Sequence, residues 1–395
     1  MIQDLLMDKI DNNFINCYIF IVIYMKTVGI ICEYNPFHNG HKYHLEKVKE
    51  LFPDSLVILV LNGYFLERGE VSVISKKDKT TIALLNGIDL VVELPFVFGT
   101  QSADIFGNIA ITILEKLQCE YIVFGSECNN LDVLHKITDY TINNKDEYDQ
   151  KVKKYLDKGL NYPTSLAKAI DIPFNFNPND LLAISYLKSI KLNNYNIKPI
   201  TIKRTNDYLD ILDNSDIVSA SNIRNRLYNN EDIIKFVPKS ALPFIKNIKL
   251  DDIFNIIKYK IITEKDLSIY LDVDEGIENR LKKVINKCNT LDELIHHTKS
   301  KRYTYNKIKR MIIHILIGIT KEDNKKLALD YLKILGFNNN GKKYLNKIKK
   351  DLNISTTPSA KSLTYQYELI AATIYDMISN ENNFEFDIRN KPIKF

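Results

Sequence analysis

The sequence predicts an α/β protein in which a parallel sheet covered by helices is followed by a second, mostly α-helical domain. Between residues 27 and 127, four apolar runs rich in β-branched residues alternate with amphipathic helical patterns. Such runs are typical of strands buried on both faces, and the helices between them are typical of parallel crossover connections. From about residue 231 helical periodicity dominates. A chain of 395 residues is long enough for two domains, which we place at 27–230 and 231–395.

The composition excludes several classes of protein. With 45% hydrophobic and 26% charged residues, it is typical of a globular protein. The five cysteines form no CxxC pair, which argues against a disulfide framework and a zinc knuckle and fits a cytoplasmic location. Residues 1–26 form a separate extension whose apolar run, 15–24, is too short to span a membrane. We therefore expect no membrane segment, and we expect translation to start at Met25 or the extension to be dispensable.

The first predicted strand, Val28 to Ile31, leads directly into a candidate binding segment. Pro36 ends the strand, Asn39 is the predicted helix cap, and the helix buries one face made of the four apolar residues between 45 and 52. The remaining elements follow in order. We expect strands at 55–61, 89–94, 121–124 and 197–204, and helices from about 77 (with Gly87 at its end), at 102–117, 131–144, 148–160 and 175–190.

The segment between the first strand and its helix, HNGH, suits an anion. A helix N-terminus offers unpaired backbone N–H groups, and Gly40 carries no side chain that would hold a polyphosphate away. His38 and His41 add donors that would stabilise charge developing on an attacked phosphate. A histidine pair near a helix start is more often a surface or packing feature. A metal site of His38, His41 and His44 lacks a cysteine or acidic partner at matching spacing, so we expect no metal bound by the protein.

Ligands of open parallel sheets bind beyond the carboxyl ends of the strands, at the point where the strand order reverses. The segments after the first, second and fourth strands, at 38–41, 62–63 and 125–127, should therefore converge.

The HxGH pattern after a first parallel strand resembles the HIGH motif of the nucleotidyltransferase superfamily. The run EYNPFHNGHKYH, followed by GYFLERGE at 63–70, DLVVELP at 89–95, SADIFG at 102–107 and VFGSE at 123–127, resembles the bacterial tRNA(Met) cytidine acetate ligase family. VSASNIR at 218–224 resembles the family's variant of the KMSKS-type loop, which closes on the triphosphate. The resemblance extends from about Met25 to near the C-terminus and implies a Rossmann-like nucleotidyltransferase domain that binds ATP with Mg²⁺.

The resemblance also implies roles for single residues. His38 and His41 would be catalytic, Ser219, Ser221 and Arg224 would hold the leaving pyrophosphate, and Gly125, Asn179 and Arg204 would place the nucleoside. Each has a structural alternative, since Gly125 suits a turn and Asn179 and Ser219 suit helix caps. The full predicted ATP-binding set is Ile31, Cys32, Glu33, Tyr34, Asn35, Pro36, Phe37, His38, Asn39, Gly40, His41, Lys42, Tyr43, His44, Gly125, Asn179, Arg204, Ser219, Ser221 and Arg224.

The polar loop at 63–79 carries further candidates. Arg68 and Lys76 lie in blocks that resemble the family, so contacts with phosphate or acetate are expected for them. The chain departs from the family at two positions, where glutamine is expected in place of Glu67 and an aromatic residue in place of Lys77.

Basic charge is concentrated in the C-terminal half. Residues 231–395 hold 30 Lys and Arg against 21 Asp and Glu, a net +9, whereas the rest of the chain carries −4. Cationic residues with interleaved tyrosines at 299–310 suit a phosphate backbone and unstacked bases. A second cluster at 341–350 is equally consistent with a solvated lysine face. The predicted tRNA-binding residues are Lys301, Arg302, Tyr303, Lys307 and Arg310.

The activity implied by the resemblance has two steps. Acetate and ATP give acetyl-adenylate and pyrophosphate, and the acetyl group then passes to the N4 amine of the wobble cytidine of elongator tRNA(Met). Two alternatives stay open: a nucleotidyltransferase that joins ATP to a small phosphorylated acceptor to make a dinucleotide cofactor, and a non-catalytic RNA-binding module with a relict ATP site. The sequence indicates no oligomeric state.

Overall fold

The computed structural model describes residues 25–160, 162–170, 172–204, 216–300 and 303–395. Residues 1–24 of the predicted extension, together with Lys301 and Arg302, lie outside the described residues. The core is a seven-stranded sheet in the order β5-β4-β1-β2-β3-β6-β7, in which β6 runs antiparallel to β3 and every other neighbouring pair is parallel. The strands are β1 (Thr27–Cys32), β2 (Leu56–Asn62), β3 (Leu90–Leu94), β4 (Tyr121–Ser126), β5 (Lys198–Lys203), β6 (Ile334–Phe337) and β7 (Ile393–Lys394).

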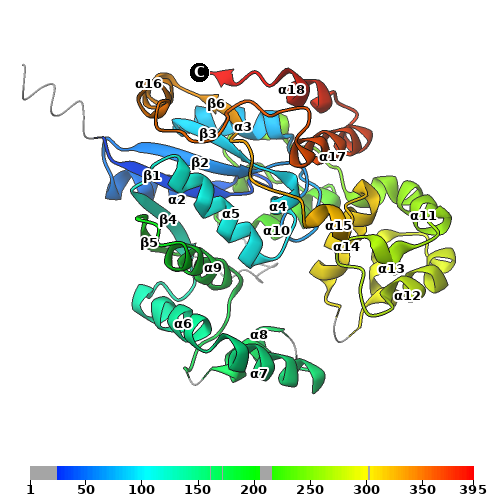
Figure 1. Cartoon of the computed structure of the whole chain (residues 1–395). Helices are drawn as coiled ribbons and strands as arrows, with labels where there is room; N and C mark the ends of the chain where they lie inside the picture. Colours follow the sequence, from blue (N-terminus) through cyan, green and yellow to red (C-terminus); the bar gives the residue numbers. More distant parts are fainter. Residues whose placement is uncertain (1–24, 161, 171, 205–215, 301–302) are drawn as a thin grey trace, which may run out of the picture.

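The predicted α/β class is confirmed. The strand order reverses at β1, which pairs with β2 on one side and with β4 on the other. Successive residues of β2 alternate between two hydrophobic cores, as the twofold period of a strand requires. Leu56, Ile58 and Val60 pack with residues of α5 and α9, whereas the intervening residues pack with α2 and α3. The sheet is therefore covered on both faces (Figure 1).

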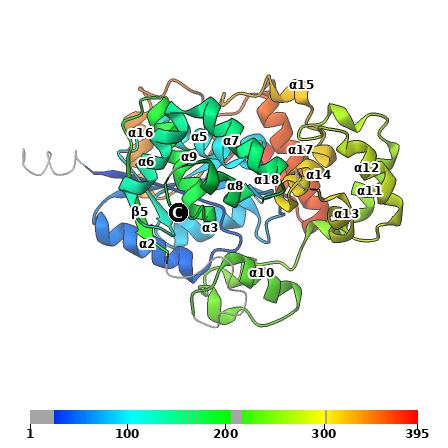
Figure 2. The same ribbon diagram turned by 90° about the horizontal axis from the view of Figure 1, so that it is seen from below.

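The helices of the first half are α2 (Asn39–Leu51), α3 (Lys76–Leu85), α4 (Phe96–Gly99), α5 (Ala103–Lys116), α6 (Leu131–Asn143), α7 (Lys145–Asp157), α8 (Tyr162–Ala169), α9 (Pro178–Leu192) and α10 (Ala220–Tyr228). The helices of the second half are α11 (Phe254–Thr263), α12 (Ile277–Val284), α13 (Leu291–Thr298), α14 (Tyr305–Ile317), α15 (Lys321–Asn324), α16 (Asn339–Ile348), α17 (Leu363–Ser379) and α18 (Asn383–Arg389). In both views, α11 to α13 lie together at one side of the molecule, and Figure 2 shows α10 standing out below the sheet.

Four local predictions are wrong. His38, not Asn39, caps α2, because its imidazole accepts a hydrogen bond from the helix backbone. Leu51 is exposed, since only the other three apolar residues of its helix face the sheet. Gly125 lies within β4 rather than ending it. Residues 334–337, which lie in the region after residue 231 that was predicted to be mostly helical, form β6 because they pair with the edge of β3.

The second half of the chain is mostly helical, but part of it returns to the sheet. α11 to α14 form a helical group, and β6, β7, α17 and α18 then pack against β3, α3 and α4. The division at residue 230 stays a prediction. Across the described residues, no helix combines the length and the apolar character needed to cross a bilayer.

A buried ionic cluster joins the returning segment to the first half. Lys76 is fully buried, and its Nζ lies 2.5 Å from Glu93, 2.7 Å from Glu368 and 2.7 Å from Asp387. Lys333, the residue before β6, also pairs with Asp387. The loop lysine expected to contact phosphate or acetate is therefore an interior residue, because three carboxylates surround it and it does not line the pocket described below.

Candidate active site

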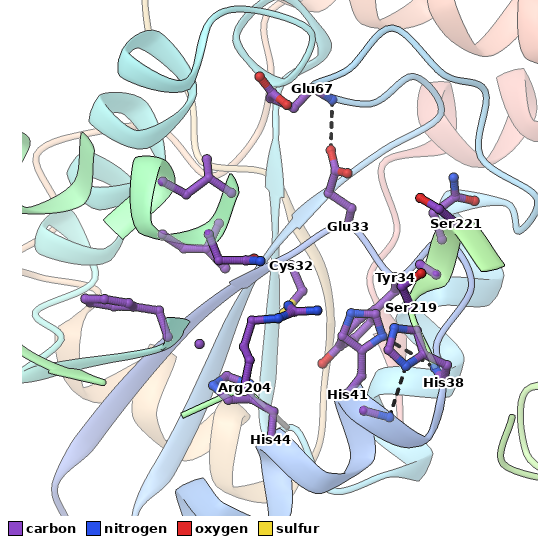
Figure 3. A pocket seen from close by; sticks show the side chains of 18 of the residues that line it. Cys32, Glu33, Tyr34, His38, His41, His44, Glu67, Arg204, Ser219 and Ser221 are labelled. Atoms are coloured by element: carbon purple, nitrogen blue, oxygen red, sulfur yellow. Dashed lines mark hydrogen bonds between the residues drawn. The ribbon is translucent and has the colours of Figure 1, made fainter. Parts of the chain in front are cut away.

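A pocket lies at the carboxyl ends of β1, β4 and β5, where the strand order reverses (Figure 3). Segments that are far apart in the sequence line it: 31–44 after β1, Gly125 in β4, Asn179 in α9, Arg204 after β5 and 217–224 at the start of α10. The predicted convergence of the segments after the first and fourth strands is confirmed. Asn62, at the end of β2, does not line the pocket but contacts Glu33, which does.

His38 and His41 cap the helix that carries them. The backbone N–H of Gly40 donates to His38 Nδ1 at 3.0 Å, and the backbone N–H of His38 faces His41 Nδ1 at 3.4 Å. A Cβ on Gly40 would lie 2.7 Å from His38 Cε1, so this glycine makes room for the imidazole ring. Gly40 also lines the pocket, and the expectation that it leaves space for a polyphosphate stays a prediction.

The three imidazoles of this segment are neutral at physiological pH. Burial, followed by the charges of Arg204 and Arg224, lowers the pKa of His38 to about 3. Burial and the charge of Arg204 lower the pKa of His44 to about 4, and burial also holds the pKa of His41 well below its usual value. Because His38 Nδ1 accepts a hydrogen bond, the proton of its ring lies on Nε2. The ring is then a hydrogen-bond donor rather than a base.

The serine-rich segment at the start of α10 is tied to the turn after β1. Ser219 is the N-cap, and its hydroxyl accepts from the backbone N–H of Asn222. Arg224 donates to the carbonyl oxygen of Asn35 at 2.7 Å and to Glu70 Oε2 at 2.6 Å. The side chain of Arg224 is 9% exposed, so this buried fork joins the two predicted landmarks, the HNGH segment and the Ser–Arg loop.

Glu70 also connects the pocket to the helical group. Besides Arg224, its carboxylate contacts Lys309 of α14 at 3.5 Å, and these cations lower the pKa of Glu70 against the opposing effect of burial. Gly69 has φ +71°, and a Cβ there would lie 2.4 Å from the backbone nitrogen of Arg310. The loop therefore packs directly on the α14 backbone. No role was predicted for Glu70, because both of its partners are remote in the chain.

Gly125, Asn179 and Arg204 form the opposite wall. Asn179 donates to Glu127 Oε1 at 2.5 Å, and the stem of Arg204 passes over Gly125, whose added Cβ would lie 3.2 Å from Arg204 Cγ. Burial lowers the pKa of Arg204, although Glu127 at 3.9 Å opposes the shift. Glu127 belongs to the segment 125–127 that was expected to converge on the site, but no role was predicted for it. Its carboxylate, two residues after the glycine of VFGSE, was the available signal.

Three buried polar atoms at the pocket have no hydrogen-bond partner among the described residues: Asn35 Nδ2, His44 Nε2 and Arg204 Nε. Buried donors without partners are costly in a folded protein. All three belong to side chains that line the same cavity, which fits a polar ligand there.

Glu33 is fixed at one end of the pocket. Its Oε1 accepts from Asn62 Nδ2 at 2.9 Å and from the backbone N–H of Glu67 at 2.8 Å. Asn62 is itself fully buried and donates to the carbonyl oxygen of Gly99 at 3.0 Å. Figure 3 shows Glu33 and Glu67 at the end of the pocket away from His41, His44 and Arg204.

Most residues of the predicted ATP-binding set line the pocket, but four do not. Phe37 is fully buried in the core below the site, with Pro36 buried beside it. The side chain of Asn39 donates to the carbonyl oxygens of Asp216 and Lys235, and Lys42 points outward to pair with Glu46. These four residues support the segment rather than face the cavity.

The described residues of the predicted tRNA-binding set lie around the start of α14. Tyr303 is only 2% exposed, and its hydroxyl donates to the carbonyl oxygen of Asp274 at 2.8 Å. Tyr303 is therefore an interior residue and is not available to stack on a base, which corrects the prediction for it. Lys307 lies 4.2 Å above the Tyr303 ring, and Arg310 approaches Glu67 at 3.6 Å.

Comparisons with known proteins agree with this geometry. A family model described as HIGH Nucleotidyl Transferase matches residues 25–389. The tRNA(Met) cytidine acetate ligase of Clostridium tetani is 34% identical, with 93% of this chain and 100% of that protein covered. The enzyme of the same name from Caldicellulosiruptor saccharolyticus is 38% identical, with 84% and 87% covered.

Solved structures show the same likeness. The crystal structure of apo Thermotoga maritima TmcAL has a TM-score of 0.84 at 26% identity, with 94% of this chain and 100% of that chain covered. A second crystal form, bound with alpha-thio ATP, has a TM-score of 0.81.

Proposed function

We propose that this chain, which belongs to the tRNA(Met) cytidine acetate ligase family, activates acetate with ATP and transfers the acetyl group to the N4 amine of the wobble cytidine of elongator tRNA(Met). The observation that carries the proposal is the joining of the HNGH segment and the Ser–Arg loop around one cavity at the switch point of the sheet.

In the first step, an acetate oxygen attacks the α-phosphorus of ATP and pyrophosphate leaves. His38 Nε2–H donates to phosphate oxygens, while Ser219, Ser221 and Arg224 hold the pyrophosphate. Because His38, Ser219 and Arg224 are buried and already oriented, they stabilise charge that develops in the transition state without reorganising. No covalent protein nucleophile is needed in such a scheme.

The nucleoside occupies the wall made by Gly125, Asn179 and Arg204. The Arg204 guanidinium, whose Nε has no hydrogen-bond partner among the described residues, suits a phosphate oxygen or the face of adenine. ATP enters as its Mg²⁺ complex, in which phosphates and water supply most of the oxygen ligands.

The tRNA binds to the part of the protein formed by residues 231–395, where the predicted basic cluster lies. Lys307 and Lys309 sit on the same helix, α14, and Lys309 reaches the pocket carboxylate Glu70. A phosphate backbone on α14 would therefore lie beside the entrance to the ATP site. A tRNA substrate also implies a cytoplasmic location.

The deciding experiment incubates the protein with ATP, labelled acetate and elongator tRNA(Met), then digests the RNA. Label in N4-acetylcytidine supports the proposal. A dinucleotide product made from a phosphorylated acceptor, or tRNA binding without acetate-dependent release of pyrophosphate, would replace it with one of the two alternatives.

Binding of tRNA is tested separately. Lys307→Ala should weaken binding and reduce the slope of log K against log salt by about one. The control is Lys116→Ala on α5, whose last turn lies just before β4 begins and hence at the far end of the sheet. If the two variants gave the same slope of log K against log salt, α14 would not contact the tRNA.

A further inference from the structure

Transfer of the acetyl group requires a group that takes a proton from the attacking amine, and the imidazoles of the pocket do not suit this task. His38 already accepts the Gly40 N–H at Nδ1 and carries its own proton on Nε2. Burial keeps His38, His41 and His44 neutral, so further protonation of any of them is unfavourable. The proton acceptor must be sought among the carboxylates.

Three carboxylates line the cavity on the side of the 63–70 loop, and two of them are engaged by cations. Glu70 pairs with Arg224 at 2.6 Å and with Lys309 at 3.5 Å. Glu67 Oε1 lies 3.6 Å from Arg310, and Glu67 Oε2 lies 3.8 Å from Arg68. Burial outweighs these charges and raises the pKa of Glu67 to about 7, whereas the cations lower the pKa of Glu70 against the effect of burial. In both residues each carboxylate oxygen faces a cation, so neither residue offers an open oxygen to a substrate proton.

Glu33 is held differently. Its Oε1 accepts two hydrogen bonds from uncharged donors, Asn62 Nδ2 and the Glu67 backbone N–H. Asn62 cannot rotate freely, since its amide also bonds to Gly99 and to its neighbour Gly63. Among the described residues, no ion pair to Glu33 is formed. One oxygen is thus anchored, and Oε2 belongs to an oriented carboxylate that faces the cavity (Figure 3).

The anchoring network gives this carboxylate the rigidity that a proton acceptor needs. Lys79 Nζ donates to the carbonyl oxygens of Asn62 and Gly63 at 3.1 and 2.8 Å, so the end of β2 is fixed from below. General base catalysis depends on such positioning as much as on basicity.

We propose that Glu33 Oε2 accepts the proton of the wobble cytidine amine during acetyl transfer. The amine nitrogen forms a bond to the carbonyl carbon of acetyl-adenylate, and the bond from that carbon to the phosphate oxygen breaks. AMP leaves with the electron pair, and one nitrogen proton passes to Oε2. This inference rests on the proposed function, because it concerns only the second of its two steps.

The test separates the two steps with Glu33→Gln. Glutamine keeps the side-chain shape and can still accept from Asn62, so acetate-dependent exchange between ATP and pyrophosphate should stay within about threefold of the wild type. Single-turnover transfer from preformed acetyl-adenylate to tRNA should fall about 10²- to 10⁴-fold. Glu46→Gln, on the exposed face of α2, is the matched control for both assays.

The comparison of the two assays excludes a purely structural role, because a distorted pocket would slow exchange and transfer together. Equal loss of exchange and transfer, or transfer that stays normal, would overturn the inference. If the wild type itself shows no acetate-dependent exchange, the proposed function fails instead, and the two failures are therefore distinguishable.

Discussion

Lys76→Met should destabilise the fold strongly, although Lys76 lies in a polar stretch of sequence. The substitution keeps the side-chain volume but leaves Glu93, Glu368 and Asp387 buried together with Lys333 as the remaining cation of the cluster. Removing one partner of a buried ionic group costs about 3–5 kcal/mol. At about 2.1 cal/mol/K of unfolding entropy per residue, a 395-residue chain should lose about 5 °C in melting temperature.

The loss of stability in the Lys76→Met variant should be larger at high pH than at low pH. Burial and the neighbouring carboxylates raise the pKa of Glu368 to about 7, so the folded state takes up a proton there more readily than the unfolded chain. Without the charge of Lys76 this preference grows. Stability lost at about pH 8 should therefore be partly regained at about pH 5.5, as the folded protein binds protons.

Thermal unfolding followed by circular dichroism at both pH values measures this effect. Lys77→Met, one residue along the chain and exposed, is the matched control and should shift the melting temperature by less than about 1 °C. Equal shifts for the two variants, or a larger loss at low pH than at high pH, would refute the account of the cluster.

Three further predictions concern the pocket. His41→Ala should reduce acetate-dependent exchange between ATP and pyrophosphate about 10²-fold or more, as measured with labelled pyrophosphate, because it removes an oriented group from beside the phosphates. Gly69→Ala should lower stability in urea unfolding by about 2–3 kcal/mol, since its Cβ would collide with the α14 backbone; Gly318→Ala, which has positive φ but open space, should cost only about 1 kcal/mol. The ring resonances of His38 should not titrate between about pH 5.5 and about pH 8 in NMR spectra, because its pKa is lowered to about 3.

Each of these has a control and a contrary outcome. His135→Ala, on the exposed face of α6, should leave the exchange reaction unchanged, and near-normal exchange in the His41 variant would count against the scheme. Equal costs for the two glycine variants would mean that the loop is not packed on α14. A titration of His38 near neutral pH would mean that its ring is solvated.

The strands of the first half could be predicted because each is a contiguous run of apolar residues. β1 to β4 are almost uniformly buried, so hydrophobic patterning alone locates them. β6 could not be located in this way, since ILGF follows a helix-like stretch and becomes a strand only by pairing with the edge of β3. Local pattern was sufficient where burial decided the structure and insufficient where a distant partner did.

The site divides in the same way. The HNGH segment and the Ser–Arg loop could each be predicted from their own residues. The hydrogen bond that joins them, from Arg224 to the carbonyl oxygen of Asn35, links residues 189 positions apart and could not be predicted from either segment alone. The prediction that Tyr303 binds tRNA was wrong for the same reason. Its basic neighbours suggested an exposed aromatic, whereas its hydroxyl partner, Asp274, lies 29 residues away.

The pairing of β6 with β3 has a consequence for synthesis of the chain. β3 leaves the ribosome well before residues 334–337, and in that interval its edge offers unpaired N–H and C=O groups to any extended segment nearby. A fragment covering residues 27–230 would keep this open edge permanently and would also lack Lys333, Glu368 and Asp387, the partners of interior charges. Recombinant pieces of the ATP-binding half should therefore aggregate unless the returning segment is supplied, covalently or as a second polypeptide.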